Sequence, residues 1–335
     1  MPVTIKDVAE ASGVCQATVS QVLNNGGRPV HPDTRERVMQ AVRALDYRPS
    51  AVARGLARKR MNTIGLGFQH VGLGGTQNIF MTTVLDGVLS VSTQRRQNTM
   101  LCTFRGWEAA ETLPDLSDGR CDGVLLLIPP MESPVPRLLR ERKVPIVVVN
   151  AQSPFNEVPS IDVDNVSAAR EMTEYLLGLG HRRIAFLLSK YNLDYSFAHE
   201  RLQGYREAMT AAGVYDPALE DTSFPDSLAL DLTGPNRPTA IFCCYDAYAL
   251  TLMDTLKARG IRVPEDMSVV GFDDIPTATA SKPGLTTVRQ PMNTLGERAA
   301  EMLLDLIEGK PAPAHHQLLS TELVIRDSAA PPSSV

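Results

Sequence analysis

The chain has 335 residues, of which 43% are hydrophobic, and its 33 basic and 38 acidic side chains give a net charge of −5. The longest apolar runs have the length of a strand and cannot cross a bilayer, and the polar N-terminus argues against a signal peptide. Five cysteines without a CxxC motif or a secretion signal exclude a disulfide framework and predict a protein of the reducing cytosol.

The first residues have the pattern of two short helices joined by a tight turn. Thr4 and Asp7 have the spacing of a capping box, and Gly13 interrupts the apolar positions where a turn is needed. A second helix is expected from about Cys15, with Val19, Val22 and Leu23 on its buried side. Its other face carries Gln16, Ala17, Thr18, Ser20 and Gln21. This pattern predicts a helix-turn-helix whose second helix reads base edges in the major groove.

The charge distribution separates DNA binding from the alternative, a small helical packing module. Residues 1–60 hold ten basic and five acidic side chains and carry +5, whereas the other 275 residues carry −10. A basic segment attracts phosphates, because counterion release drives the sequence-independent part of DNA affinity. The pattern therefore favours a DNA-binding domain.

A third helix and a hinge follow. The apolar spacing predicts a helix over 32–46 that begins at Pro32 and covers the first two helices. Ser50 can cap a short helix, Ala51 to Arg58, with Leu56 on one face. A lone helix of this length is marginal in water, so the alternative is a linker with an exposed leucine.

From residue 62 onward, apolar strand-like runs alternate with helical stretches. The expected strands are 63–68, 99–104, 123–128, 144–149, 184–188, 239–243 and 268–272, and the expected helices include 167–178, 201–212 and 246–259. Such alternation is typical of βα units and parallel sheets, and the number of strands favours two doubly wound lobes. The Pro/Ser-rich residues 329–335 are expected to be disordered.

Several long motifs give the chain a resemblance to a known family. Residues 4–60 resemble the headpiece of the LacI/GalR transcriptional regulators, and further landmarks follow in the family's order. These are HERLQGYREAM at 199–209, VPEDMSVVGFDD at 263–274, LTTVRQPMNTLGERAAEMLLDLIEGK at 285–310 and ELVIRDS at 322–328. The resemblance implies an all-α helix-turn-helix headpiece and a periplasmic-binding-protein-like α/β core of two doubly wound parallel-sheet lobes.

The resemblance also implies where the domains begin and end. We expect a DNA-binding domain at 1–48, a hinge helix and linker at 49–61, and a core for effector binding and dimerisation at 62–328. In that fold the chain crosses between the lobes three times. The first lobe would then comprise about 62–160 and 291–319, and the second about 161–290 and 320–328.

The family's DNA contacts carry over onto specific positions. Base readout is implied for Gln16, Ala17 and Gln21, phosphate contact for Thr4, Thr18, Ser20, Asn24 and Tyr47, and insertion into the minor groove for Leu56. The resemblance implies an arginine at the position of Gln21, in a TVSRVLN motif that reads TVSQVLN in this chain. Arginine suits guanine and glutamine suits adenine, so we expect an operator that differs from the common half-site where Gln21 meets it.

The effector residues implied by the family lie in the cleft between the lobes. Arg201 matches an arginine that binds ligand hydroxyls or carboxylates, Asp273 matches an acidic contact, and Asn150 a further ligand position. Phe68, Gln69 and Phe80 are candidates from the first lobe. Tyr245 stands where the family usually has asparagine, which indicates a reshaped pocket.

These features predict a homodimeric repressor that binds double-stranded, pseudo-palindromic operator DNA under control of a small-molecule effector, with a nucleoid-associated cytoplasmic location. A protein corepressor is the main alternative. A solute-binding protein would lack the basic segment, and an enzyme would need a nucleophile–base pair that the sequence does not suggest. We expect no cofactor and no metal, since GLGGT lacks a P-loop ending and His315-His316 is a lone pair.

Overall fold

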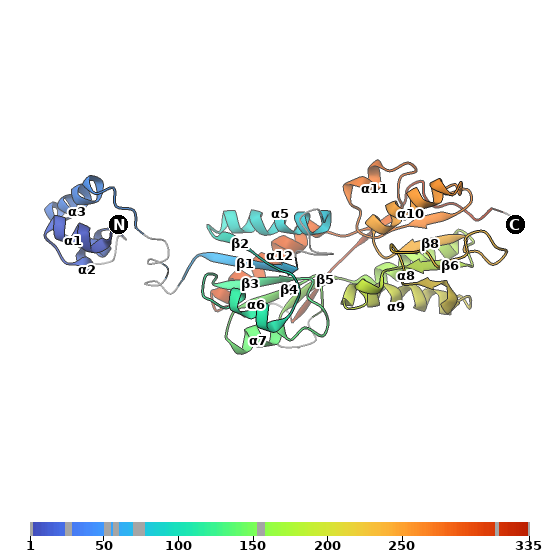
Figure 1. Cartoon of the computed structure of the whole chain (residues 1–335), viewed down its shortest axis with the longest axis horizontal. Coiled ribbons are helices and arrows are strands. Elements are labelled where there is room, and N and C mark those ends of the chain that lie inside the picture. Colours follow the sequence, from blue (N-terminus) through green and yellow to red (C-terminus); the bar gives the residue numbers. More distant parts are fainter. Residues whose placement is uncertain are drawn as a thin grey trace. The chain divides into compact units, whose positions relative to one another are not determined.

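The computed structural model of the chain describes residues 3–23, 29–49, 55, 60–69, 78–152, 158–311 and 315–333. Its internal contacts divide it into two units, Met1–Asn62 and Thr63–Val335. The first unit holds the short N-terminal helices and the second holds the α/β core (Figure 1). Among the described residues, no helix combines the length and apolarity needed to span a membrane.

The N-terminal unit is a three-helix headpiece, as the sequence predicted. It consists of α1 (Ile5–Ser12), α2 (Gln16–Leu23) and α3 (Pro32–Ala44), packed around Val8, Ala9, Val19, Val22, Val38 and Ala41. The expected capping box between Thr4 and Asp7 is present, and the Asp7 carboxylate accepts from the Thr4 backbone nitrogen (2.7 Å) and also from the Thr4 hydroxyl (2.8 Å). Gly13 ends α1 at a φ of 66°, a left-handed conformation that glycine adopts without strain. Asn24, Leu56 and most of the predicted hinge helix lie outside the described residues.

The first lobe of the core is built on a six-stranded parallel sheet in the order β11-β5-β4-β3-β1-β2. The strands are β1 (Thr63–Gln69), β2 (Asn98–Phe104), β3 (Gly123–Leu127), β4 (Ile146–Val149), β5 (Ser160–Val163) and β11 (His316–Leu319). Alternate residues of β3 face two separate apolar clusters, Leu125 one and Leu126 the other. Burial on both faces explains why the inner strands read as continuous apolar runs.

Helices cover both faces of this sheet. On one face lie α5 (Ile79–Gln94) and α12 (Met292–Ile307), and on the other lie α6 (Ala109–Leu116) and α7 (Val135–Glu141) (Figure 1). The pair α5 and α12 cross at glycines: a Cβ on Gly87 would lie 2.0 Å from the carbonyl oxygen of Asn293, and one on Gly296 would lie 2.0 Å from that of Val84. Only glycine permits backbones to approach this closely.

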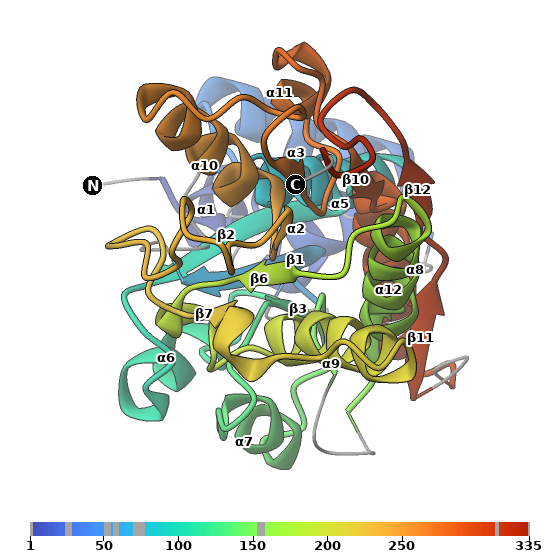
Figure 2. The ribbon, with the colours of Figure 1, turned by 90° about the vertical axis from the view of Figure 1, so that its right-hand side faces the viewer.

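The second lobe has a four-stranded parallel sheet in the order β7-β6-β8-β9. Its strands are β6 (Ile184–Leu187), β7 (Glu220–Asp221), β8 (Ala240–Cys243) and β9 (Ser268–Val270). The helices α8 (Asn165–Gly178) and α9 (Ser196–Ala211) pack together on one face, and α10 (Asp246–Ala258) lies on the other side of β6 (Figure 2). The lobe is completed by the short α11 (Pro276–Ala280), two 3₁₀ turns (Lys190–Asn192 and Pro217–Leu219) and the antiparallel pair β10 (Thr287–Arg289) and β12 (Glu322–Val324).

Two boundaries differ from those expected from the sequence. The strand β5 pairs within the first lobe's sheet, so the first crossover follows Val163 rather than residue 160. The predicted disorder of the tail does not hold for residues 329–333. There the Ala330 nitrogen donates to the Ser268 hydroxyl (3.1 Å), and its carbonyl accepts from that hydroxyl and lies 2.9 Å from His181 Nε2. Backbone hydrogen bonds of this kind fix a segment whose composition alone suggested disorder.

Candidate functional site

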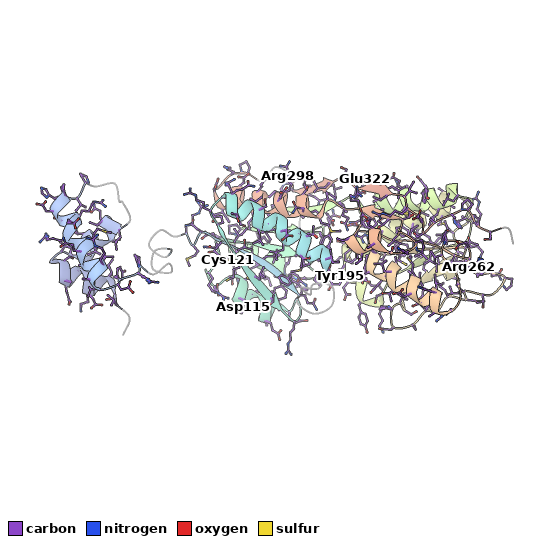
Figure 3. All side chains as sticks on the ribbon, turned by 90° about the horizontal axis from the view of Figure 1, so that it is seen from above. Asp115, Cys121, Tyr195, Arg262, Arg298 and Glu322 are labelled. Atoms are coloured by element: carbon purple, nitrogen blue, oxygen red, sulfur yellow. The ribbon has the colours of Figure 1, made fainter. Side chains whose placement is uncertain are left out.

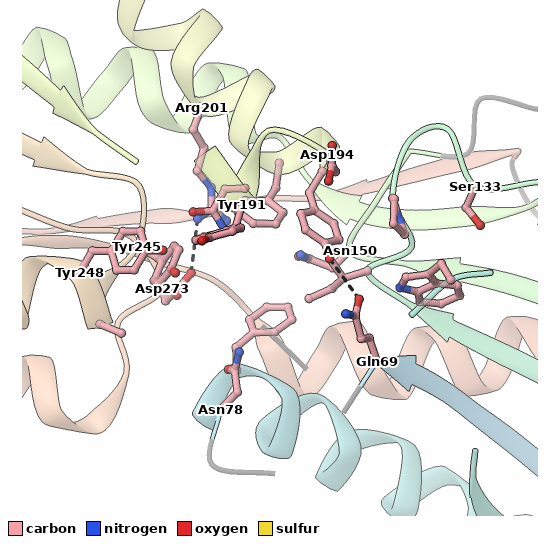
Figure 4. A pocket seen from close by; sticks show the side chains of 18 of the residues that line it. Gln69, Asn78, Ser133, Asn150, Tyr191, Asp194, Arg201, Tyr245, Tyr248 and Asp273 are labelled. Carbon is pink, nitrogen blue, oxygen red and sulfur yellow. Dashed lines mark hydrogen bonds and ion pairs between the residues drawn. The ribbon is translucent and has the colours of Figure 1, made fainter. Parts of the chain in front are cut away.

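A cavity of about 1100 Å³ is lined by residues of both lobes of the core. Several lining residues follow the carboxyl ends of parallel strands: Gln69 ends β1, Asn150 follows β4, and Tyr245 and Asp273 come shortly after β8 and β9 (Figure 4). Ligands of open α/β sheets bind at this edge, because the loops that follow the strands converge there. The fold therefore places this cavity where a ligand site is expected.

Arg201 is the fixed cation of this cavity. It projects from α9, and its side chain is only 2% exposed. Its Nε donates to Asn165 Oδ1 (2.9 Å) and one terminal nitrogen donates to the carbonyl oxygen of Cys244 (2.7 Å). The guanidinium carbon also lies 3.6 Å from the centre of the Phe272 ring. These contacts hold the planar guanidinium in one orientation, so it is preorganised for directional hydrogen bonding.

Asp273 lies beside this arginine, with one carboxylate oxygen 3.7 Å from an Arg201 nitrogen (Figure 4). The amide of Gln290 donates to that oxygen across 2.6 Å. Burial raises the pKa of Asp273 to about 6, although the charge of Arg201 and the Gln290 hydrogen bond oppose this shift. The carboxylate thus remains available at neutral pH as an acceptor for ligand hydroxyls.

The turn that carries Asp273 is strained and held from outside the cavity. Asp273 and Asp274 have φ values of 125° and 59°, which are unusual for residues other than glycine. Asp274 accepts from Arg289 (2.7 Å) and from Arg326 (2.6 Å) through its two carboxylate oxygens. These two ion pairs fix the backbone from which the Asp273 side chain reaches the cavity.

Aromatic rings make up much of the cavity wall. They are Phe80, Trp107, Tyr191, Tyr195, Phe197, Tyr245 and Tyr248. The rings of Tyr245 and Tyr248 lie 4.0 Å apart, and Tyr195 lies where the two lobes meet (Figure 3). The lobes are also joined directly, since Tyr195 Oη donates to Gln69 (3.4 Å) and the Met131 nitrogen donates to the Asp194 carbonyl (2.9 Å).

A buried polar cluster lies at the crossover between β5 and α8. The Asn165 amide donates to Glu200 (3.0 Å) and to Asp162 (3.4 Å), while its oxygen accepts from Arg201. Burial, reinforced by the charge of Glu200, raises the pKa of Asp162 to about 7, and burial also raises the pKa of Glu200. The cluster connects a carboxyl group of the first lobe with the cavity's arginine in the second.

The structure places most of the predicted effector residues together. Gln69, Phe80, Asn150, Arg201, Tyr245 and Asp273 all line the cavity. The prediction for Phe68 was wrong: this side chain is 1% exposed and belongs to the core, because alternation along β1 directs Phe68 away from the side that Gln69 occupies. Sequence reasoning missed Trp107, Tyr191, Tyr195, Phe197, Tyr248 and Gln290. A search for aromatic residues just beyond strand ends would have found Trp107, which follows β2.

In the headpiece, the residues predicted to contact bases lie on α2. Gln16 and Ala17 are exposed in its first turn, and Gln21 is partly exposed one turn later. Among the predicted phosphate contacts, Thr4 is exposed, whereas Thr18, Ser20 and Tyr47 are half-buried. The Tyr47 backbone nitrogen donates to the Val42 carbonyl (3.0 Å), which ties the end of α3 to that tyrosine.

Comparison with known proteins identifies the family. Residues 4–50 match the model of bacterial regulatory proteins of the lacI family, and residues 173–329 match a periplasmic binding protein-like domain. The transcriptional regulator CelR of Thermobifida fusca is 35% identical over 97% of this chain and 98% of its own. The repressor PurR of Vibrio cholerae is 36% identical over 97% of each chain.

The chain belongs to the LacI family. It is accordingly a DNA-binding transcriptional regulator and not an enzyme. Solved structures agree with this assignment. The lac repressor dimer bound to operator and the anti-inducer ONPF covers 98% of the chain with a TM-score of 0.79 at 27% identity. A complex of the regulator CelR with cellobiose covers 97% with a TM-score of 0.71 at 32% identity. In this LacI-family chain, both the predicted headpiece and the predicted two-lobed core are confirmed.

Proposed function

We propose that this protein is a homodimeric repressor that acts at the nucleoid, and that a sugar or related metabolite in the cavity between its lobes controls operator binding. The observation that carries the proposal is the Arg201–Asp273 pair, a buried cation and carboxylate 3.7 Å apart on the cavity wall. A fixed guanidinium fork donates to ligand oxygens, and a carboxylate accepts from hydroxyl groups. Together they suit a polyhydroxylated ligand.

The headpiece supports the DNA-binding half of the proposal. Two copies would present two α2 helices, so a pseudo-palindromic operator follows from two-fold symmetry. Gln16, Ala17 and Gln21 would read bases, while Thr4, Thr18, Ser20, Asn24 and Tyr47 would set the register through phosphates. Leu56 would insert into the minor groove from the hinge segment.

For the effector to control operator binding, it must bind two arrangements of the dimer with unequal affinity. The lobes of each core contact one another across the cavity through Tyr195 and Gln69. A ligand held by residues of both lobes would favour the arrangement in which these lobes are closed, and thereby change whether two hinge segments can pair on DNA. A relative supports control by a bound sugar, since the structure of the regulator CelR was solved in complex with cellobiose.

The proposal is tested by comparing two carboxylate variants. The operator is first selected from a random DNA pool, and ligands are found by thermal shift, which reports binding to the native state. We expect a stabilising sugar to change the operator affinity of the unaltered protein by roughly tenfold, within the usual range of coupling. Asp273→Asn should abolish the response, whereas Asp254→Asn, at an exposed position of α10, should retain it. A ligand that binds the cavity without changing operator affinity would refute the proposal.

A further inference from the structure

Three buried side chains on the cavity wall each have a polar atom without a hydrogen-bond partner in the part of the chain that the structure describes. They are Trp107 Nε1, Asn150 Oδ1 and Gln290 Oε1. Trp107 is 8% exposed, Asn150 3% and Gln290 5%. Buried polar groups are nearly always satisfied, so unsatisfied atoms that border a cavity indicate where a ligand supplies the missing partner.

These atoms belong to different parts of the cavity. Gln290 donates its amide to Asp273 and so belongs to the site around Arg201. Trp107 and Asn150 come from the first lobe, after β2 and β4 respectively. The ring of Trp107 is held edge-on to Phe104, with centroids 4.7 Å apart, so its indole nitrogen is fixed. The first lobe therefore offers one donor and one acceptor that the Arg201 site does not use.

We infer that Trp107 and Asn150 form a second sugar-binding subsite and that the effector is a neutral saccharide of at least two linked rings. The inference rests on the proposed function and specifies its ligand. One ring would occupy the site of Arg201, Asp273 and Gln290. The next would receive a hydrogen bond from the indole N–H of Trp107 and donate a hydroxyl hydrogen to the side-chain oxygen Oδ1 of Asn150.

The size and surface of the cavity support a ligand of more than one ring. A volume of about 1100 Å³ lies just above the range of about 300–1,000 Å³ that small-molecule sites occupy. Aromatic side chains line both walls, with Trp107 and Phe80 from the first lobe and Tyr191, Tyr245 and Tyr248 from the second. Flat apolar rings present surfaces on which the C–H faces of sugar rings can lie.

The charges that line the cavity argue against a phosphorylated or carboxylated ligand. The lining carboxylates are Glu108, Glu132, Asp194, Asp226 and Asp273, and Arg201 is the only basic side chain among the described lining residues. Arg201 lies 3.7 Å from Asp273 and Lys190 lies 3.7 Å from Asp226, so these two cations offset two of the five carboxylates. An anion would therefore enter a field dominated by negative charge, which disfavours its binding.

Trp107 is the single tryptophan of the chain, so its fluorescence reports this subsite alone. The full-length protein is titrated with glucose, glucose 6-phosphate, and the neutral disaccharides cellobiose, maltose and lactose with their trisaccharide homologues. We expect at least one di- or trisaccharide to change the emission and to bind about tenfold or more tightly than glucose, and the phosphate to give no response. A response to the phosphate, or no response to any neutral di- or trisaccharide, would overturn the inference.

Calorimetry on variants then tests the subsite itself. Trp107→Phe keeps a ring but removes the indole N–H, so it should weaken binding of the responding oligosaccharide about threefold to tenfold and leave glucose binding unchanged. Tyr175→Phe, on α8 and outside the cavity lining, should leave both unchanged. If Trp107→Phe lost the same affinity for the oligosaccharide and for glucose, or lost none for either, the subsite would be rejected. If another class of small molecule binds and alters operator affinity, the inference fails while the proposed function stands.

Discussion

Tyr195 of the second lobe donates its hydroxyl to Gln69 of the first lobe across 3.4 Å, and both residues line the cavity. Tyr195 precedes α9, and Gln69 is the last residue of β1. The bond therefore connects the start of the helix that carries Arg201 with the sheet of the first lobe. It stabilises the arrangement in which both lobes border the same cavity.

Removal of this hydroxyl should weaken effector binding. Tyr195→Phe keeps the ring but loses the bond between the lobes, so the closed arrangement becomes less populated and the apparent affinity falls about twofold to tenfold. Calorimetric titration with the responding sugar measures this change, and Tyr175→Phe serves as the matched control. An unchanged affinity would show that the bond contributes nothing to closure.

Asp162 should make the stability of the protein depend on pH. Its pKa is raised to about 7 in the fold, so the folded chain binds a proton that the unfolded chain has lost. The free energy of unfolding therefore decreases as the pH rises from about 4 to about 7. Asp162→Asn cannot ionise and should remove this decrease, which makes the variant more stable than the natural chain by about 4 kcal/mol at neutral pH, since each pKa unit of the shift corresponds to about 1.4 kcal/mol.

Urea denaturation at several pH values checks this prediction. The two proteins should be similarly stable near pH 4 and diverge above it, and Asp254→Asn should follow the unaltered chain throughout. Glu200→Gln is a second test. The charge of Glu200 helps to raise the pKa of Asp162, and the Asn165 amide donates to both carboxylates. Parallel pH profiles for the unaltered chain and Asp162→Asn would show that Asp162 is already ionised in the fold.

The contact between α5 and α12 should not tolerate a methyl group. Gly296→Ala places a Cβ against the carbonyl oxygen of Val84, so the helices must separate, and we expect a loss of at least about 2 kcal/mol in the free energy of unfolding. Gly178→Ala provides the contrast. A Cβ there has nothing within 4 Å, so alanine should be neutral or stabilise α8 slightly. Similar losses in both variants would contradict the role of close packing.

Gln21 should determine one base pair of the operator. Selection from a random DNA pool should recover a half-site that departs from the family's common sequence where Gln21 contacts it. Gln21→Arg should shift the preference there toward guanine, with discrimination of about 1–3 kcal/mol. Measuring the affinities of single-base operator variants for both proteins tests this. Recovery of the common half-site with the unaltered protein would contradict the predicted departure at this base pair.

Local patterns in the sequence were enough to predict much of the fold. The Thr4–Asp7 spacing and Gly13 define α1 and its end, and these depend only on neighbouring residues. The apolar runs that became β1, β3 and β8 were found because strands buried on both faces are continuously apolar. Short or polar strands such as β7, β10 and β12 were not predicted. Their composition is not typical of strands, and they form because they pair with neighbouring strands in the fold.

The sequence by itself determined the helix-turn-helix and the parallel-strand lobes, and its resemblance to the LacI/GalR regulators pointed to Arg201 and Asp273 as candidate ligand contacts. Tertiary structure alone decided that Phe68 faces the core, that Trp107 joins Asn150 on the cavity wall, and that Ala330 is held by Ser268. The physical reason is the range of the interactions. Caps, turns and periodicity act between residues a few positions apart, whereas a cavity wall is assembled from strand ends that are distant in the chain and adjacent only after folding.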